Sequence, residues 1–164
     1  MLKVGLESGD QGVLDALDKG IRLETASRIL ANLERAGIAA YVYLLFGTPA
    51  EGPVEAQRTL NFVAARHAAI TFLNVAIFNL PLHSPQAKAL ETIPFYDGDL
   101  SLYGRFHHPS GWHRGEVRRF LDHSFRRHPD VAAILRRDPP VFTSNHAPLL
   151  CLARERSERM GNAS

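Results

Sequence analysis

The stretch Ile38–Phe46 (IAAYVYLLF) decides the fold class of this chain, and Gly47-Thr48-Pro49 ends it. It is almost continuously apolar and aromatic, which is typical of a strand buried on both faces of a parallel sheet. A similar stretch, Ile70–Phe78 (ITFLNVAIF), follows it, and the shorter Leu2–Leu6 precedes it. Three such stretches at this spacing, with helical patterns between them, predict an α/β fold built on a parallel sheet.

The segments between these stretches have the period of amphipathic helices. Residues 23–36 place apolar side chains at i, i+3, i+4 and i+7, and Gly37 follows as a stop. These positions are Ala26, Ile29, Leu30 and Leu33. Residues 53–66 begin with proline and direct Ala56, Leu60, Val63 and Ala64 inward. A shorter helix is expected after Ser8-Gly9-Asp10, with Val13, Leu14 and Leu17 on one face and Gly20 as its stop.

The chain changes character after residue 85. Residues 86–115 lose this periodicity and are rich in Pro, Gly, Asp and His, which predicts a loop. Helices are expected again over Glu116–Arg127 and Pro129–Arg137. The net charge also changes, from −3 over residues 1–100 to +5 over residues 101–164, where all 11 basic residues are arginines. We therefore divide the chain into an α/β part, residues 1–85, and a loop and helical extension, residues 86–164.

Composition excludes several classes of protein. The chain has 164 residues, 45% of them hydrophobic and 22% charged, as expected of one ordinary soluble domain. Its single cysteine, Cys151, excludes a disulfide framework and any zinc or iron–sulfur site that takes several thiolates from this chain. We expect Cys151 to be an inert packed thiol and the protein to be cytoplasmic, with no membrane association.

Residues 41–51 (YVYLLFGTPAE) resemble the fifth-strand motif Gly-x-Ile-x-Gly-x-x-Glu of radical S-adenosylmethionine (SAM) enzymes, with Tyr41 in place of the first glycine. Residues 4–9 (VGLESG) and the helix ending in Ala36-Gly37-Ile38 are similar to the fourth strand and following helices of that family. Residues 59–85 are similar to its next helix and sixth strand. The resemblance covers residues 1–85 and is closest to the branch that often carries a cobalamin-binding domain.

The resemblance implies a partial TIM-type barrel, about half a barrel, of three parallel strands with crossover helices, followed by the extension. The family holds its [4Fe–4S] cluster on a Cys-x3-Cys-x2-Cys loop, which this sequence lacks. We therefore expect a fragment or subunit of a radical SAM enzyme, of unknown substrate and inactive alone. A missing N-terminal half-barrel, or a chain that supplies it, would hold the cluster, and a missing domain could hold cobalamin. The exposed strand edge predicts self-association.

The cofactor-binding residues that the resemblance implies are Glu7, Ser8, Lys19, Phe46, Gly47, Asn79, Leu80 and Pro81. Glu7 would bond the SAM ribose hydroxyls, and Lys19 would meet the SAM carboxylate. Phe46 and Gly47 would face the adenine, which the end of the sixth strand also meets. The structural alternatives are a helix-start carboxylate for Glu7 and a charge at a helix C-terminus for Lys19. Glu51 is interpreted as a loop or capping carboxylate rather than a catalyst.

Other readings of the sequence are less favoured. His107, His108 and His113 form the best metal-like group, but they lack the i, i+4 spacing of a zinc-binding helix, so no metal site is predicted. The arginine pairs at 118–119, 126–127 and 136–137 leave nucleic-acid binding as an alternative that we do not favour, because no stacking aromatic residues interleave with them. A non-catalytic half-barrel partner of another chain is the other alternative.

Overall fold

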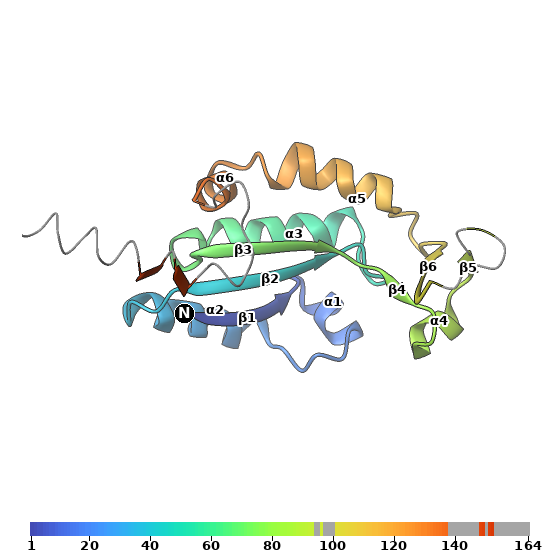
Figure 1. The fold of residues 1–164 in the computed structure, drawn as a ribbon, viewed down its shortest axis with the longest axis horizontal. Helices are drawn as coiled ribbons and strands as arrows, with labels where there is room; N and C mark the ends of the chain where they lie inside the picture. Colours follow the sequence, from blue (N-terminus) through green and yellow to red (C-terminus); the bar gives the residue numbers. More distant parts are fainter. Residues whose placement is uncertain (94–95, 97–100, 138–147, 150, 153–164) are drawn as a thin grey trace, which may run out of the picture.

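The structure is a computed structural model that describes residues 1–93, 96, 101–137, 148–149 and 151–152. The first half contains β1 (Leu2–Glu7), α1 (Gln11–Ala16), α2 (Leu23–Arg35), β2 (Ala40–Phe46), α3 (Pro53–Ala64), the 3-10 turn η1 (His67–Ala69) and β3 (Phe72–Ile77). The second contains β4 (Leu80–Pro81), α4 (Pro85–Ala89), β5 (Thr92–Ile93), β6 (Tyr103–Phe106), α5 (Arg114–Phe120), the π-helical turn η2 (Leu121–Phe125) and α6 (Pro129–Leu135). The fold is therefore mixed α/β (Figure 1).

The three predicted strands form one parallel sheet in the order β1-β2-β3, which confirms the predicted α/β class with a parallel sheet. Val42 of β2 pairs with Val4 on one side and with Leu73 on the other. Among the described residues, β1 and β3 each have a single neighbour in this sheet, so the sheet does not close into a barrel.

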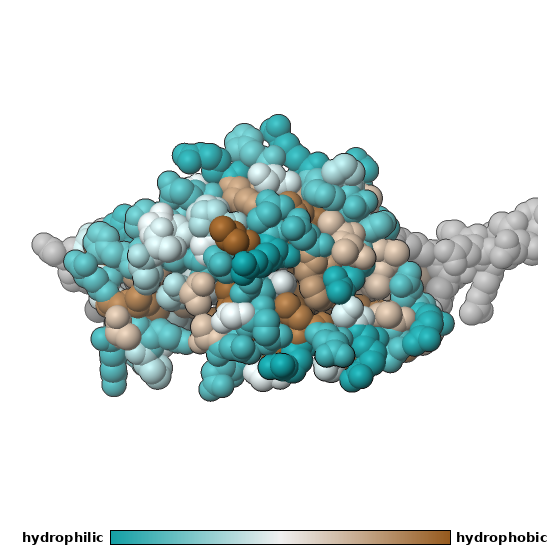
Figure 2. Space-filling view, turned by 180° about the vertical axis from the view of Figure 1, so that it is seen from behind, coloured by the Kyte–Doolittle hydropathy of each residue, from teal (hydrophilic) through white to brown (hydrophobic). Residues whose placement is uncertain are grey.

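Helices α2, α3 and α6 and the turn η2 pack on the same face of this sheet. Alternate β2 side chains from Ala40 to Phe46 share one hydrophobic core with Leu30 of α2, Leu60 of α3 and Ile134 of α6. Figure 1 shows the strands in front of α2 and α3. From behind, where these helices lie, the surface is mostly hydrophilic (Figure 2). This arrangement buries the apolar stripes that the sequence predicts.

The opposite face of the sheet, which we call the Tyr41 face, carries the intervening side chains. These are Lys3, Gly5, Tyr41, Tyr43, Leu45, Phe72, Asn74 and Ala76. Near the start of the strands Tyr41 and Phe72 are buried, and the half-buried Cys151 packs against them. Near the carboxyl ends Gly5 and Ala76 are exposed. The prediction that strands 2 and 3 are buried on both faces is therefore correct for most of β2 and wrong for the end of β3.

Three smaller expectations about the helices also need correction. Ile29 is 43% exposed, because the stripe of α2 that packs on the sheet narrows to Ala26, Leu30 and Leu33. Helix α1 ends at Ala16, well before Gly20, so Leu17 is its C-cap and only half-buried. Helix α3 ends at Ala64, which is also only half-buried.

The segment predicted to be a loop contains secondary structure. Strands β4, β6 and β5 form a small antiparallel sheet, in which Leu80 pairs with Gly104 and Thr92 with Phe106. Pro81 is tolerated because β4 is a two-residue edge strand. The prediction failed because strands of two to four residues are too short to show a period.

The described part of the extension packs on the same core as residues 1–85. Val117, Leu121, Phe125 and Val131 join the core cluster, and the Phe46 ring lies 5.1 Å from that of Phe125. Residues 114–125 are continuously helical, with a π turn over Leu121–Phe125. This agrees with the helix predicted over Glu116–Arg127. Residues 153–164 lie outside the described part of the chain. No helix among the described residues is both long and apolar enough to cross a membrane.

Candidate functional site

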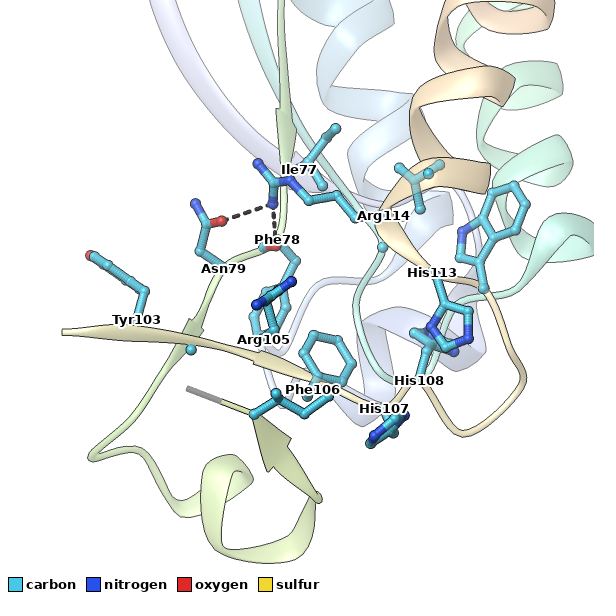
Figure 3. A pocket seen from close by; sticks show the side chains of 16 residues that line it. Ile77, Phe78, Asn79, Tyr103, Arg105, Phe106, His107, His108, His113 and Arg114 are labelled. Atoms are coloured by element: carbon cyan, nitrogen blue, oxygen red, sulfur yellow. Dashed lines mark hydrogen bonds between the residues drawn. The ribbon is translucent and has the colours of Figure 1, made fainter. Parts of the chain in front are cut away.

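A pocket of about 540 Å³ lies beyond the carboxyl ends of β2 and β3. Gly47 follows β2, Ile77 ends β3, and Phe78 and Asn79 follow β3; all four line the pocket. The remaining walls come from Ile93 of β5, from β6 and from residues 107–117, up to the first turn of α5 (Figure 3). The pocket thus lies at the strand ends where parallel α/β folds bind ligands, and the extension closes it.

Glu51 does not line this pocket, but its side chain links two residues that do, Gly47 and Trp112. Its Oε2 accepts hydrogen bonds from the Gly47 backbone N–H and from Trp112 Nε1, the latter at 3.3 Å. The side chain is only 1% exposed, and Oε1 has no hydrogen-bond partner among the described residues. Burial raises the pKa of Glu51 to about 7, against the two hydrogen bonds, which lower it. Glu51 therefore caps the loop, as the sequence predicts, and also carries a titratable proton near neutral pH.

His108 holds the same loop through its ring. Its Nε2 lies 2.8 Å from the carbonyl oxygen of Thr48, and its Nδ1 accepts from the Ser110 backbone N–H at 3.2 Å. A carbonyl only accepts and an N–H only donates, so Nε2 carries the proton, as in a neutral imidazole. His108 is 6% exposed. It therefore fixes the pocket wall and is not available as a ligand to a metal.

Gly47 has a positive φ of 77°, which glycine adopts without strain. A Cβ at this position would lie 3.1 Å from Cγ2 of Val117. The absence of a side chain at Gly47 therefore lets α5 approach the end of β2, and Gly47 also lines the pocket.

The pocket is basic. Arg105, His107, His113 and Arg114 line it together with His108, and none of the described residues that line it is acidic. Arg114 Nη1 donates to Asn79 Oδ1 at 2.8 Å and to the Phe78 carbonyl oxygen at 3.3 Å. Figure 3 shows these two bonds and the Arg105 side chain turned toward the same region of the pocket. Such a site is suited to an anion.

Of the eight residues that the resemblance assigns to a cofactor, the pocket brings together Gly47 and Asn79. Glu7 lies at the end of β1, outside the pocket lining, where the pairing with β2 shifts register. Its Oε1 lies 3.3 Å from the position that a Cβ on Gly5 would occupy, so the carboxylate lies over the Tyr41 face. Glu7 also has a positive φ of 64°, which is uncommon for a residue with a side chain.

Ser8 and Lys19 occupy other environments. Ser8 is fully buried, and its hydroxyl lies 3.1 Å from Thr59 Oγ1 and accepts from the Asp10 backbone N–H. Lys19 is exposed in the loop after α1, three residues beyond the end of that helix. The alternative role of Lys19, a positive charge in the last turn of a helix, is therefore wrong, because α1 ends at Ala16.

The other three residues lie near the strand ends. The Phe46 side chain is fully buried on the helical face of the sheet, so only its backbone is at the strand end. Leu80 is fully buried in β4, and Pro81 is exposed. The sequence did not single out Arg105, Trp112 or Arg114; the only signal for them was the concentration of Arg and His after residue 100.

No group of three His, Cys, Asp or Glu side chains in the described part of the chain is arranged to hold a metal ion. Cys151, the single cysteine, packs against Tyr41 and Phe72 near the start of the strands. Because a [4Fe–4S] cluster takes three or four thiolates, this chain's own residues do not fit one. Comparisons of the chain with models of protein families, with curated proteins and with solved structures find no match.

Proposed function

We propose that this chain forms part of a radical SAM barrel and contributes the ribose and adenine side of the SAM site. The cluster that radical SAM chemistry requires would be held by cysteines of another polypeptide segment. If the complete protein uses cobalamin, that cofactor would also lie outside this chain. The resemblance of residues 1–85 motivates the proposal, and two structural observations support it.

The observation that carries the proposal is that α2, between β1 and β2, and α3, between β2 and β3, lie on one face of the sheet. In a barrel every crossover helix lies outside and the other face lines the interior, an arrangement that three strands in sequential order share with one half of a doubly wound sheet. The Tyr41 face has the mixed character of such an interior, with Tyr43 and Asn74 half-buried and Lys3 exposed. Further parallel strands beside β1 or β3 would cover it.

The backbone of Glu7 is the second supporting observation. Its left-handed conformation costs roughly 1–2 kcal/mol relative to an ordinary strand conformation. Strain of this kind is found preferentially at functional sites. The strain directs a carboxylate over the face that would line the barrel, at the carboxyl end of the strand. A carboxylate there could accept both hydroxyls of a ribose.

Saturation-transfer NMR with SAM tests the proposal. We expect transfer to the adenine and ribose protons of SAM, and weaker binding, by about tenfold or more, in Glu7→Gln, which loses the charge of the acceptor. Glu24→Gln, on the exposed side of α2, is the matched control and should bind SAM as the parent does. Absence of transfer, or equal affinities of Glu7→Gln and the parent, would remove the SAM-site assignment.

Anaerobic reconstitution separates the catalytic proposal from the alternative of a non-catalytic barrel partner. The chain alone should bind no stoichiometric iron–sulfur cluster, as judged by iron analysis and visible absorption. A chain with a Cys-x3-Cys-x2-Cys loop that co-purifies and acquires SAM-cleaving activity with this chain would support the catalytic proposal. A partner that is equally active without this chain would favour the structural alternative.

A further inference from the structure

We propose that residues 107–113, which connect β6 to α5 and which we call the strap, form a proton-controlled closure of the pocket. The strap is closed while the carboxyl group of Glu51 is protonated, and ionisation of this group favours release of the strap from the loop 47–51. The inference concerns access to the pocket and does not depend on the proposed role in SAM binding, because Glu7 lies outside the pocket lining.

Two side chains of the strap hold the loop that follows β2. His108 Nε2 donates to the carbonyl oxygen of Thr48 at 2.8 Å, and Trp112 Nε1 donates to Glu51 Oε2 at 3.3 Å. The two residues that each bond joins are 60 and 61 positions apart in the sequence. Since His108 and Trp112 both line the pocket, the position of the strap determines the shape of this wall.

Glu51 is the part of this contact that responds to pH. Its side chain is 1% exposed, and neither its Oε1 nor the hydroxyl oxygen of Thr48 has a hydrogen-bond partner in the described structure. Two N–H donors at Oε2 alone do not replace the hydration that a carboxylate loses on burial. The protonated group is uncharged and costs less to bury, so the closed strap favours it. The raised pKa of Glu51 agrees with this geometry.

The charged groups that face Glu51 do not compensate an anion there. Glu55 of α3 and Asp10 of the loop after β1 are acidic and raise the pKa of Glu51 further. Asp10 is paired with Arg58 at 2.7 Å. From the strap, His108 directs its Nε2–H to a neutral carbonyl oxygen. Within the part of the chain that the structure describes, no basic side chain forms an ion pair with Glu51.

Trp112 is the anchor of the strap. It is 7% exposed, and its ring centroid lies 6.0 Å from that of Phe120. Gly111 before it has a positive φ of 73°, and a Cβ on Gly111 or on Gly115 would meet nothing within 4 Å. The backbone on both sides of Trp112 therefore has room to rotate. We expect the indole to leave the loop without movement of the parallel sheet.

The proton linkage sets how strongly the strap responds to pH. In the closed state the pKa of Glu51 is about 7, and in the open state the hydrated carboxyl group takes its ordinary value of 4.5. Between these pH values opening releases a proton. The ratio of open to closed strap therefore rises with pH over this range, by up to roughly 300-fold in total. Above about pH 7 both states are ionised and the ratio stays constant.

Hydrogen exchange of the Trp112 indole N–H tests the proposal. Trp112 is the single tryptophan of the sequence, so its Nε1–H signal in an NMR spectrum is assigned without ambiguity. Exchange is measured from pH 5 to pH 8 in the parent and in Glu51→Gln, which does not titrate and corrects for the intrinsic pH dependence of exchange. We expect the ratio of the two rates to rise about tenfold or more between pH 5 and pH 7 and then to level off. Glu24→Gln, exposed on α2, should follow the parent.

The amide of Val42 separates release of the strap from unfolding of the whole chain. Val42 is fully buried in the central strand β2, so we expect its amide to exchange only through global unfolding. At pH 7 the protection factor of the Trp112 indole should be at least tenfold lower than that of the Val42 amide. If Glu51→Gln fails to fold, exchange of N-acetyltryptophanamide supplies the same intrinsic correction.

Two results would overturn the proposal. If Trp112 and Val42 had equal protection factors at every pH, the strap would open only when the whole chain unfolds. If the corrected exchange rate of Trp112 did not change between pH 5 and pH 7, the strap would open independently of the proton on Glu51. Neither result would bear on SAM binding, which is measured separately through Glu7→Gln.

Discussion

The loops that follow β1 and β2 leave the same edge of the sheet and both carry buried polar side chains, but these side chains differ in how completely they are hydrogen-bonded. In the first loop, residues 8–10, each buried polar side chain is paired: Ser8 with Thr59, and Asp10 with Arg58 and the Val13 N–H. In the second loop, residues 47–51, Thr48 Oγ1 and Glu51 Oε1 have no partner in the described structure. A fully paired loop rigidifies a fold, whereas an incompletely paired one marks a place where function is to be sought.

The first loop should be the more sensitive to added volume. A Cβ on Gly9 would lie 2.6 Å from Thr59 Cα and 2.7 Å from Phe62 Cβ, and Thr59 Cα is a backbone atom that can move only with α3. We expect Gly9→Ala to destabilise the fold by about 3 kcal/mol or more, measured by urea unfolding. Gly115→Ala in α5, where a Cβ meets nothing within 4 Å, is the control and should stabilise by up to about 1 kcal/mol. Unfolding midpoints that agree for Gly9→Ala and the parent would mean that the two elements are not packed this closely.

The second loop should show a dependence of stability on pH. The pKa of Glu51 is raised from 4.5 to about 7, mainly by burial, with smaller contributions from the charges of Glu55 and Asp10. Between these pH values the folded chain holds a proton that the unfolded chain has released. Stability is therefore highest below about pH 4.5 for this group and is lost as pH rises through about 7, by up to about 3 kcal/mol.

Glu51→Gln removes this dependence and keeps an oxygen that can accept from Gly47 and Trp112. We expect the variant to be more stable than the parent at pH 8 and to converge with it near pH 5, as measured by thermal melts across that range. Glu24→Gln, exposed on α2, should leave the pH profile of the parent unchanged. Parallel profiles of Glu51→Gln and the parent would show that Glu51 titrates at an ordinary pKa.

The smallest effect concerns the outer edge of the first loop. Burial alone would raise the pKa of Asp10, but its hydrogen bonds with Arg58 and the Val13 N–H lower it below 3.8. Arg58→Ala should therefore raise the pKa of Asp10, measured by NMR titration of its carboxyl carbon. The melting temperature at pH 7 should change little, because the Arg58 side chain is exposed and the pair, at 2.7 Å, is screened by water. If the melting temperature of Arg58→Ala fell as far as that of Gly9→Ala, the Arg58–Asp10 pair would matter as much to stability as the packing of Gly9 against Thr59, which would contradict this prediction.

Sequence patterns predicted the parallel sheet and its helices well where the elements are long. The apolar run before Gly47 and the stripe of α2 each repeat over several turns or residues, so the pattern is unambiguous. The small sheet β4-β6-β5 was missed because its strands have four residues at most. Its pairing brings Leu80 next to Gly104, a contact between distant residues that no local pattern encodes.

The candidate site divides in the same way. The strand ends at Gly47 and Asn79 were expected to meet a ligand, because the resemblance to radical SAM enzymes implies that the adenine lies there. Arg105, Trp112 and Arg114 were not, because they reach that edge only when β6 pairs with β4 and α5 packs beside Gly47. The basic character of the pocket is thus a consequence of how the extension folds back.

By itself, the sequence determined that three strands would lie parallel and that a lone cysteine could not hold a cluster, since both depend on the kind and order of neighbouring residues. Only the tertiary structure decided that the helices share one face and that the pocket is cationic. It also decided that Glu51 keeps its proton near neutral pH. These properties depend on which distant groups exclude water from a site, and desolvation and charge compensation arise only when those groups are brought together.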